Sequence, residues 1–489
     1  MTFARRTGLV GVALVLAVAG CTSRSHGQGT GPPASANSTQ SRNSTSPSST
    51  LPSSSPTSSA SGCPASYAAP DPKRPQVRLA FTVSPDLTSV QGSEHVEFTP
   101  DLPVTELVFR LTANTVPTVA AGNKIVVNSA KADHGAGKAK YDLDGADPST
   151  QGGLLRIPFG SKVAAGTTVT ADLTFTVTLG NQSFDRFGRA GDAAARYAWF
   201  GSAQPLLAWE RGHGWHTEPM IRFAAESATS EAMQTDLTVT APAADTVIMS
   251  GDPPNAAPKG GTRTWHSTVD AARDVSVAVG PFSVSDTRAN GVKLRVGAPS
   301  ANERDQLVPL FDLAITEHAK RYGPFPFPSL SVARVPAGGG GIEYPSSILM
   351  LDSSRLVAVH ETAHQWFYAM VGDSQAQHAW LDEAFASYAE QLVDQDPPPP
   401  GTLDEPGNVD KPTASYGGAE GEYYSVTYDK GAAALHAARD AAGPAKFDAA
   451  IRCYVNANAW RIANPSDLQT ALSGLPAALS VLRKAHALP

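Results

Sequence analysis

The spacing of apolar residues changes near Gly291 and divides the chain into two parts. Between about Gln76 and Asp286 the period is two, most clearly in a run at every second position, Val169, Ala171, Leu173, Phe175, Val177 and Leu179. One face of such a strand is buried. Shorter runs of the same kind are separated by Pro, Gly, Asn and Asp, so we predict an antiparallel β domain over residues 76–287.

Helical spacing dominates after a further strand at residues 292–296. We predict helices over five stretches, Arg304–Tyr322, Arg355–Val371, Ala379–Val393, Lys430–Ala442 and Ala445–Ala457. Residues 394–421 contain a run of four prolines and are predicted to form a long loop. The sequence therefore predicts an α+β multidomain protein, with an α/β domain over residues 288–489.

The first 20 residues have the composition of a secretory signal peptide, with Arg5 and Arg6 before an apolar stretch that is too short to span a bilayer. The segment Val18-Ala19-Gly20-Cys21 resembles the lipobox of bacterial lipoproteins. This resemblance implies acylation of Cys21 and anchoring to the outer face of the cell membrane. The alternative is an ordinary cleaved signal with an incidental cysteine.

A linker rich in Ser, Thr and Pro follows over residues 21–75, and 21 of the 41 residues from Thr22 to Gly62 are Ser or Thr. Such a segment buries too little apolar surface to fold, so we predict a disordered tether. Beyond it, Cys63 and Cys453 either form a disulfide or remain two buried thiols, and the sequence leaves both alternatives open.

The composition excludes several classes of function. The chain carries 38 Lys and Arg against 45 Asp and Glu, a formal charge of -7 without long blocks of one sign, which argues against nucleic acid as a ligand. Three cysteines cannot form a four-thiolate zinc site. Any bound metal must be held by His, Asp or Glu.

The segment from His360 to His364 lies inside a predicted helix, so both imidazoles share one face and can reach one metal. Glu361 lies next to His360, where its carboxylate can accept a proton from water at an open coordination position. Glu383 follows His364 after eighteen residues and supplies a third ligand. The pattern predicts one catalytic Zn²⁺ per chain.

This combination, with Glu383 inside Trp-Leu-Asp-Glu, resembles the gluzincin zinc metallopeptidases of the aminopeptidase N and leukotriene-hydrolase family. Gln365-Trp366 and Val371-Gly372-Asp373 also match that family. The resemblance implies a saddle-like β domain followed by a thermolysin-like catalytic domain. Larger members continue into a long helical domain, whereas this sequence ends at Pro489, so we expect a more open cleft or closure by a partner.

Two further segments extend the resemblance. Residues 340–344 occupy the place of the GxMEN motif, which implies substrate binding by Gly340, Gly341 and Glu343, the last through the free α-amine of a peptide. Tyr344 replaces the asparagine of the motif. Tyr428 matches the tyrosine of Tyr-Glu-Lys-Gly, which implies that it stabilises the oxyanion.

The resemblance thus implies a peptidase, with an aminopeptidase as the leading interpretation. Because Tyr344 departs from the motif and the cleft is expected to be open, an endopeptidase is an alternative, and a non-catalytic surface-binding lipoprotein is another. His213 and His216 have i, i+3 spacing, which indicates either a second metal or, more often, a packed loop. Nothing in the sequence gives His378 a ligand role or indicates an oligomeric state.

Overall fold

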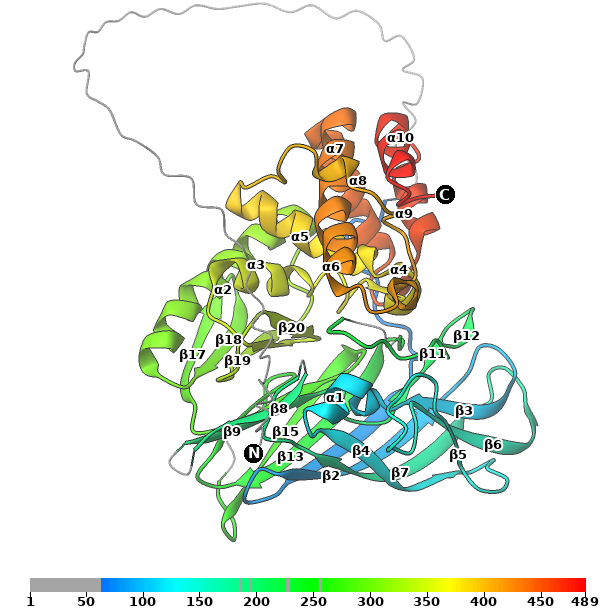
Figure 1. Cartoon of the computed structure of the whole chain (residues 1–489), viewed down its shortest axis with the longest axis vertical. Coiled ribbons are helices and arrows are strands. Elements are labelled where there is room, and N and C mark those ends of the chain that lie inside the picture. The colour runs from blue at the N-terminus through cyan, green and yellow to red at the C-terminus, as the bar shows by residue number, and fades with distance from the viewer. Residues whose placement is uncertain (1–62, 185, 193–194, 226–228, 255–256) are drawn as a thin grey trace, which may run out of the picture. The chain divides into compact units, whose positions relative to one another are not determined.

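The computed structural model describes residues 63–489 apart from 185, 193–194, 226–228 and 255–256 (Figure 1). The predicted signal segment, Cys21 and the linker up to Gly62 lie outside the described residues. From Cys63 to Pro489 the chain forms one compact unit. Among the described residues, no helix has both the length and the apolar surface needed to cross a membrane.

The first part of this unit is built from β-sheets (Figure 1). The largest has six strands in the order β15-β13-β1-β2-β7-β4, formed by Thr262–Ala272, Met233–Pro242, Gln76–Val83, Ser89–Phe98, Val169–Thr178 and Lys124–Ala132. All neighbours pair antiparallel except β1 and β13, which are parallel. In β7, alternate side chains are buried as predicted.

Two four-stranded sheets and a short pair, β11 (Trp209–Glu210) with β12 (Gly214–Trp215), complete the β domain. One has the order β10-β3-β6-β5, formed by Leu206–Leu207, Val104–Arg110, Leu154–Val163 and Lys140–Asp142. The other has the order β14-β16-β9-β8, formed by Thr246–Met249, Ser276–Gly280, Arg196–Gly201 and Phe187–Gly191. Phe81 of β1 packs edge-on against Phe200 of β9, with ring centroids 5.2 Å apart, so the sheets share one core.

The second part contains a five-stranded sheet in the order β17-β18-β19-β21-β20. Its strands are Ser283–Ala289, Val292–Ala298, Ser329–Arg334, Ser347–Met350 and Gly341–Tyr344. Because β17 pairs with β18, this sheet starts at Ser283 rather than at the expected boundary of 288. Helices α2 (Ala301–Tyr322) and α3 (Arg355–Ala363) pack against its apolar side chains.

A helical layer follows, in which α5 (Trp380–Asp394) packs against α7 (Gly431–Ala442) and α7 against α8 (Pro444–Ala457) and α10 (Pro476–Lys484) (Figure 1). Shorter helices are α4 (Gln375–His378), α6 (Glu420–Tyr423) and α9 (Pro465–Ala471). A π-helical segment, η4 (Tyr424–Lys430), joins α6 to α7.

Helix α3 is shorter than predicted, because it ends at Ala363 and not at Val371. The apolar residues that continue the helical spacing, Trp366, Phe367, Met370 and Val371, are buried in irregular turns. Apolar periodicity cannot distinguish a continued helix from buried turns here, since every residue from 362 to 371 is buried.

The chain is fixed to the fold from Cys63, although residues 63–75 belonged to the predicted linker. Cys63 and Cys453 form a disulfide, with Cα atoms 5.1 Å apart. The choice that the sequence left open is therefore decided in favour of the disulfide, which joins the start of the described chain to α8.

Candidate functional site

Helices α3 and α5 bring three candidate metal ligands together. His360 lies in α3, His364 is the C-cap residue that follows its last residue, and Glu383 is in the first turn of α5. Glu383 Oε2 lies 3.3 Å from His360 Nε2 and 3.4 Å from His364 Nε2. The ligand atoms of all three lie within 4.8 Å of one another, so they can bind one ion.

The chemistry of these donors fits zinc. Two imidazoles and one carboxylate leave a fourth position of a tetrahedral ion open. Burial lowers the pKa of His360, which favours the neutral ring that a metal requires. Burial alone would raise the pKa of Glu383, but the two imidazoles hold it below its usual value, so this carboxylate is ionised.

Asp382 orients His364, a role that the sequence analysis did not assign. His364 Nδ1 donates a hydrogen bond to Asp382 Oδ1 at 2.5 Å, and both side chains are almost fully buried. A carboxylate only accepts, so the proton lies on Nδ1 and leaves Nε2 to a metal. Gln375 Nε2 donates to the other oxygen of Asp382 at 3.3 Å. The position of Asp382 immediately before Glu383 was the available sequence signal.

A second group of possible ligand atoms, in Glu343, His364 and Asp382, also lies within 4.8 Å. It shares His364 with the first group, and the hydrogen bond from His364 to Asp382 uses Nδ1 of that ring. We therefore assign this group to the surroundings of the same centre.

The candidate base, Glu361, lies against Gly341 at the start of β20. A Cβ placed on Gly341 would be 2.5 Å from Glu361 Cγ and 2.8 Å from Glu361 Oε1. Glu361 is 5% exposed, so its carboxylate occupies the space that the glycine leaves. Gly340, the neighbouring glycine, has φ 74° and accepts from Leu351 N at 3.0 Å, and a Cβ there would meet nothing within 4 Å.

Strand β20 sends alternate side chains to opposite faces. Ile342 and Tyr344 pack in a cluster with Trp199 and other residues of the β domain. Gly201 has no room for a Cβ, which would lie 2.0 Å from Tyr344 Oη. Glu343, between them, is buried, and its carboxylate lies within 4.8 Å of ligand atoms of His364 and Asp382. The side chain of Tyr344 therefore packs in the interface between the two domains.

Gln365 fixes this hairpin to the end of α3. Its Nε2 donates to Tyr344 O at 3.0 Å, and its Oε1 accepts from Ser346 N at 3.0 Å. Gln365 and Ser346 are both buried. The glutamine that matches the family motif thus sets the position of the β20 strand relative to the metal ligands.

Tyr428 lies in η4, with its ring nearly parallel to the imidazole of His360 and centroids 6.0 Å apart. Burial and the negative charge of Glu383 raise the pKa of Tyr428 well above its usual value, so the phenol remains a neutral donor. Two neighbouring tyrosines point elsewhere, since Tyr424 Oη donates to Ala224 O at 2.9 Å and Tyr416 Oη lies 3.2 Å from a threonine hydroxyl.

The β domain holds the turn after His364 through Arg273, another residue that the sequence analysis missed. This buried guanidinium donates to Tyr368 O at 2.9 Å, Ser230 O at 2.8 Å and Arg461 O at 2.7 Å. A Cβ on Gly372 would lie 2.0 Å from Arg273 Cζ, which gives a packing reason for the glycine of Val-Gly-Asp.

The histidines considered for a second metal serve other roles. His216 is bonded through one nitrogen to Glu210 at 2.6 Å and through the other to Glu218 at 3.0 Å. Burial lowers its pKa, but the two carboxylates outweigh burial and raise it to about 9. His213 stacks on the ring of His216. In the described part of the chain, neither they nor His378 join a group of three possible metal ligands.

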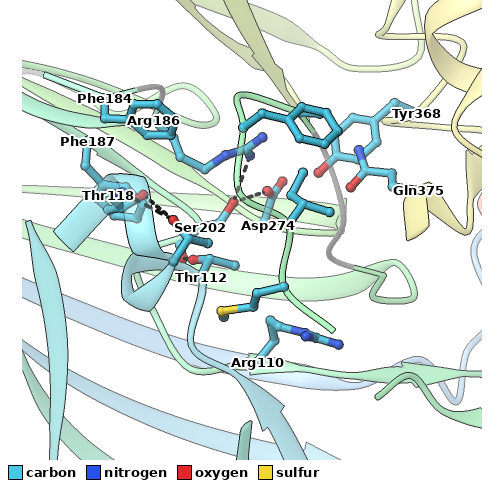
Figure 2. Close-up of a pocket in the computed structure, with 15 residues that line it drawn as sticks. Arg110, Thr112, Thr118, Phe184, Arg186, Phe187, Ser202, Asp274, Tyr368 and Gln375 are labelled. Atoms are coloured by element: carbon cyan, nitrogen blue, oxygen red, sulfur yellow. Dashed lines mark hydrogen bonds between the residues drawn. The ribbon is translucent and has the colours of Figure 1, made fainter. Parts of the chain in front are cut away.

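A cavity of about 560 Å³, including its opening to solvent, lies between the domains and is lined by both polar and apolar side chains (Figure 2). Ser202 donates to Asp274 at 2.5 Å and accepts from Arg186 at 3.4 Å, while Tyr368 and Gln375 lie across from them. The cavity touches the candidate centre only indirectly, since Gln375 bonds the Asp382 carboxylate.

Part of the sequence is similar to known proteins. The peptidase family M1 domain matches residues 344–483. Aminopeptidase M1-B of Oryza sativa subsp. japonica is 27% identical over 239 residues, which cover 40% of this chain and 27% of that protein. Aminopeptidase N of Mus musculus is 31% identical over 132 residues, which cover 22% of this chain and 14% of that protein. The chain thus spans about a quarter or less of the length of these relatives.

Solved structures share the fold over a larger part of the chain. An M1 zinc metallopeptidase from Deinococcus radiodurans aligns with a TM-score of 0.59 at 19% identity and covers 85% of this chain and 94% of that one. A mutant of the enzyme from that organism, bound to a Tyr-Ser-Ala substrate, has the same TM-score and identity. The predicted fold class and the predicted resemblance to the aminopeptidase N family are confirmed.

Proposed function

We propose that this chain is a zinc-dependent aminopeptidase that hydrolyses the N-terminal peptide bond of peptides. The observation that carries the proposal is the convergence of His360, His364 and Glu383, with the Glu343 carboxylate within 4.8 Å of His364 and the Glu361 side chain against Gly341 on the same strand as Glu343. The relatives called aminopeptidases and the solved relative with a bound peptide support the choice of substrate.

His360, His364 and Glu383 would hold one Zn²⁺ per chain. When bound, zinc supplies a Lewis acid for the scissile carbonyl and lowers the pKa of the attacking water. Asp382 keeps the proton of His364 on Nδ1, which directs Nε2 toward the ion.

The protein side chains carry out the proton transfers. Glu361 takes a proton from the attacking water onto its carboxylate and returns it to the leaving amine. Tyr428 donates a hydrogen bond to the oxyanion that forms at the scissile carbonyl, and its raised pKa keeps that proton in place. Gly341 leaves the space in which the Glu361 carboxylate lies.

Glu343 would bind the ammonium group of the substrate, so that only the first residue reaches the cleavage position. It lies on the face of β20 opposite Tyr344, and the Tyr344 side chain packs against the β domain. The departure from the asparagine of the family motif therefore puts a bulky ring in the interface, which removes one reason for preferring an endopeptidase.

The test is an activity profile of the purified full-length protein on aminoacyl-naphthylamides and on one peptide with a free or an acetylated terminus. We expect cleavage that a chelator abolishes, that Zn²⁺ restores and that Glu361→Gln lowers by several orders of magnitude. Equal rates on the free and acetylated peptides would indicate an endopeptidase. Stoichiometric zinc without cleavage of any substrate would indicate the surface-binding alternative.

We also propose that the protein is a lipoprotein, anchored through acylated Cys21 on the outer face of the cell membrane. The lipobox-like sequence supports this location, and so does the Cys63–Cys453 disulfide, because such bonds persist in oxidising compartments. Labelling with a radioactive fatty acid should mark the wild type and not Cys21→Ser. Equal labelling of both proteins would refute the anchor.

A further inference from the structure

Residues 63–75, called the strap below, lie between the linker and β1 and contact both domains. At its start the strap is held by the Cys63–Cys453 disulfide and by Asn456 Nδ2, which donates to Pro64 O at 2.8 Å. At its end Pro75 O accepts from Gln234 N at 2.8 Å, next to the first strand of the β domain. The strap is thus fixed at both ends.

Between these ends, Tyr67 points into the catalytic domain. Its hydroxyl donates to Pro324 O at 2.7 Å and accepts from Trp366 Nε1 at 3.1 Å. A Cβ on Gly323 would lie 2.6 Å from this hydroxyl, so the glycine that ends α2 also makes room for the Tyr67 hydroxyl. The hydroxyl is therefore held in one position by groups on two segments.

Trp366 is the second residue after His364 and is fully buried. Its ring packs edge-on against Phe325, with centroids 5.4 Å apart. Its backbone closes the turn, since Trp366 N donates to Ala363 O at 2.9 Å and Val371 N donates to Trp366 O at 3.0 Å. A displaced Trp366 would therefore move the turn that carries His364.

We propose that Tyr67 is a positioning residue for the metal centre, acting through its hydrogen bond with Trp366 on the turn that carries His364. The inference rests on the proposed function and deepens it, because it adds a residue outside both domains to the groups that place a ligand. Groups that orient metal ligands directly change metal affinity by about 10–100-fold when they are removed. Tyr67 acts through one more residue, so a smaller effect is expected.

Tyr67→Phe tests this, because it deletes the hydroxyl and keeps the ring. We measure the zinc affinity of the full-length protein by chelator competition, then kcat, KM and the melting temperature. We expect Tyr67→Phe to bind zinc about three- to tenfold more weakly than the wild type. Its kcat should be lower and its KM should stay within about twofold of wild type. In a Trp366→Phe background, Tyr67→Phe should have little further effect on zinc affinity, since the shared hydrogen bond is already absent.

Asn456→Ala is the matched control, because it removes another hydrogen bond between the strap and the catalytic domain, at Pro64. It should lower the melting temperature and leave zinc affinity unchanged. If Tyr67→Phe lowers only the melting temperature, as the control does, the Tyr67 hydroxyl contributes only to stability and the inference is wrong. If the wild type binds no zinc, the proposed function fails first, so the two failures are distinguishable.

Discussion

Replacing Gly341 by Ala should disable the proposed base without removing it. Gly341 has no positive φ, so an alanine fits the backbone there. Its new Cβ, however, would lie 2.5 Å from Glu361 Cγ and 2.7 Å from Glu361 Cδ. Ordinary contact begins near 3.4 Å, so the carboxylate must move by about 1 Å.

The cost of that movement can be estimated from catalytic geometry. A misplacement of about 1 Å lowers a rate by about 10²-fold, which corresponds to about 2.7 kcal/mol of activation free energy. Overpacking by one methyl group costs about 1–3 kcal/mol of unfolding free energy, and because the Glu361 side chain is flexible we expect a loss near the lower end of this range. The three atoms nearest to this Cβ all belong to Glu361, which is not a proposed metal ligand, so zinc affinity should stay the same.

Steady-state hydrolysis of an aminoacyl-naphthylamide by Gly341→Ala measures kcat/KM, and chelator competition measures zinc affinity. Gly338→Ala is the matched control, because a Cβ at Gly338 meets nothing within 4 Å and its φ is not positive. The control should keep wild-type activity. A Gly341→Ala protein that retained more than half of the wild-type kcat/KM would refute either the placement of Glu361 or its role as the base.

Three further outcomes are expected. Asp382→Asn should weaken zinc binding by about 10–100-fold in chelator competition, since a neutral amide holds His364 less well, and an unchanged affinity would contradict that role. Replacing Cys63 and Cys453 by Ser should lower the free energy of unfolding by about 2–5 kcal/mol, because the disulfide closes a loop of 390 residues, and an unchanged urea midpoint would disprove this. His216 has a folded pKa of about 9 against an ordinary 6.5, so its contribution of up to about 3 kcal/mol is complete below pH 6.5 and is lost as pH rises through 9. Urea midpoints across this range should fall further for the wild type than for His216→Gln, and parallel slopes would contradict the assignment.

The main features of the candidate metal centre could be predicted because they are local. His360 and His364 are one helical turn apart, so any helix through them places both rings on one face. Glu383 was predicted as the third ligand from the next predicted helix, and the family resemblance of Trp-Leu-Asp-Glu then supported this choice, since a spacing of eighteen residues does not by itself bring a second helix into contact. The order of a β domain and an α/β domain also followed from the change in apolar period.

Other features were not accessible to this reasoning. The end of α3 was placed too late, because residues 362–371 are buried on every side and their spacing carries no sign of a turn. Tyr344 suggested a weakened substrate site, yet its side chain packs on the β domain, where Gly201 leaves it room. The role of Arg273 depends on three carbonyl groups from distant segments, Ser230, Tyr368 and Arg461.

The sequence by itself determined the candidate metal ligands and the candidate base, because helical periodicity and residue chemistry are properties of short segments. Only the tertiary structure decided how these groups are held. The contacts of Asp382, Gly341 and the strap join residues up to several hundred positions apart, and the pairing of Cys63 with Cys453 does the same. Such contacts depend on the packing of whole domains, which leaves no periodic signal in any one segment.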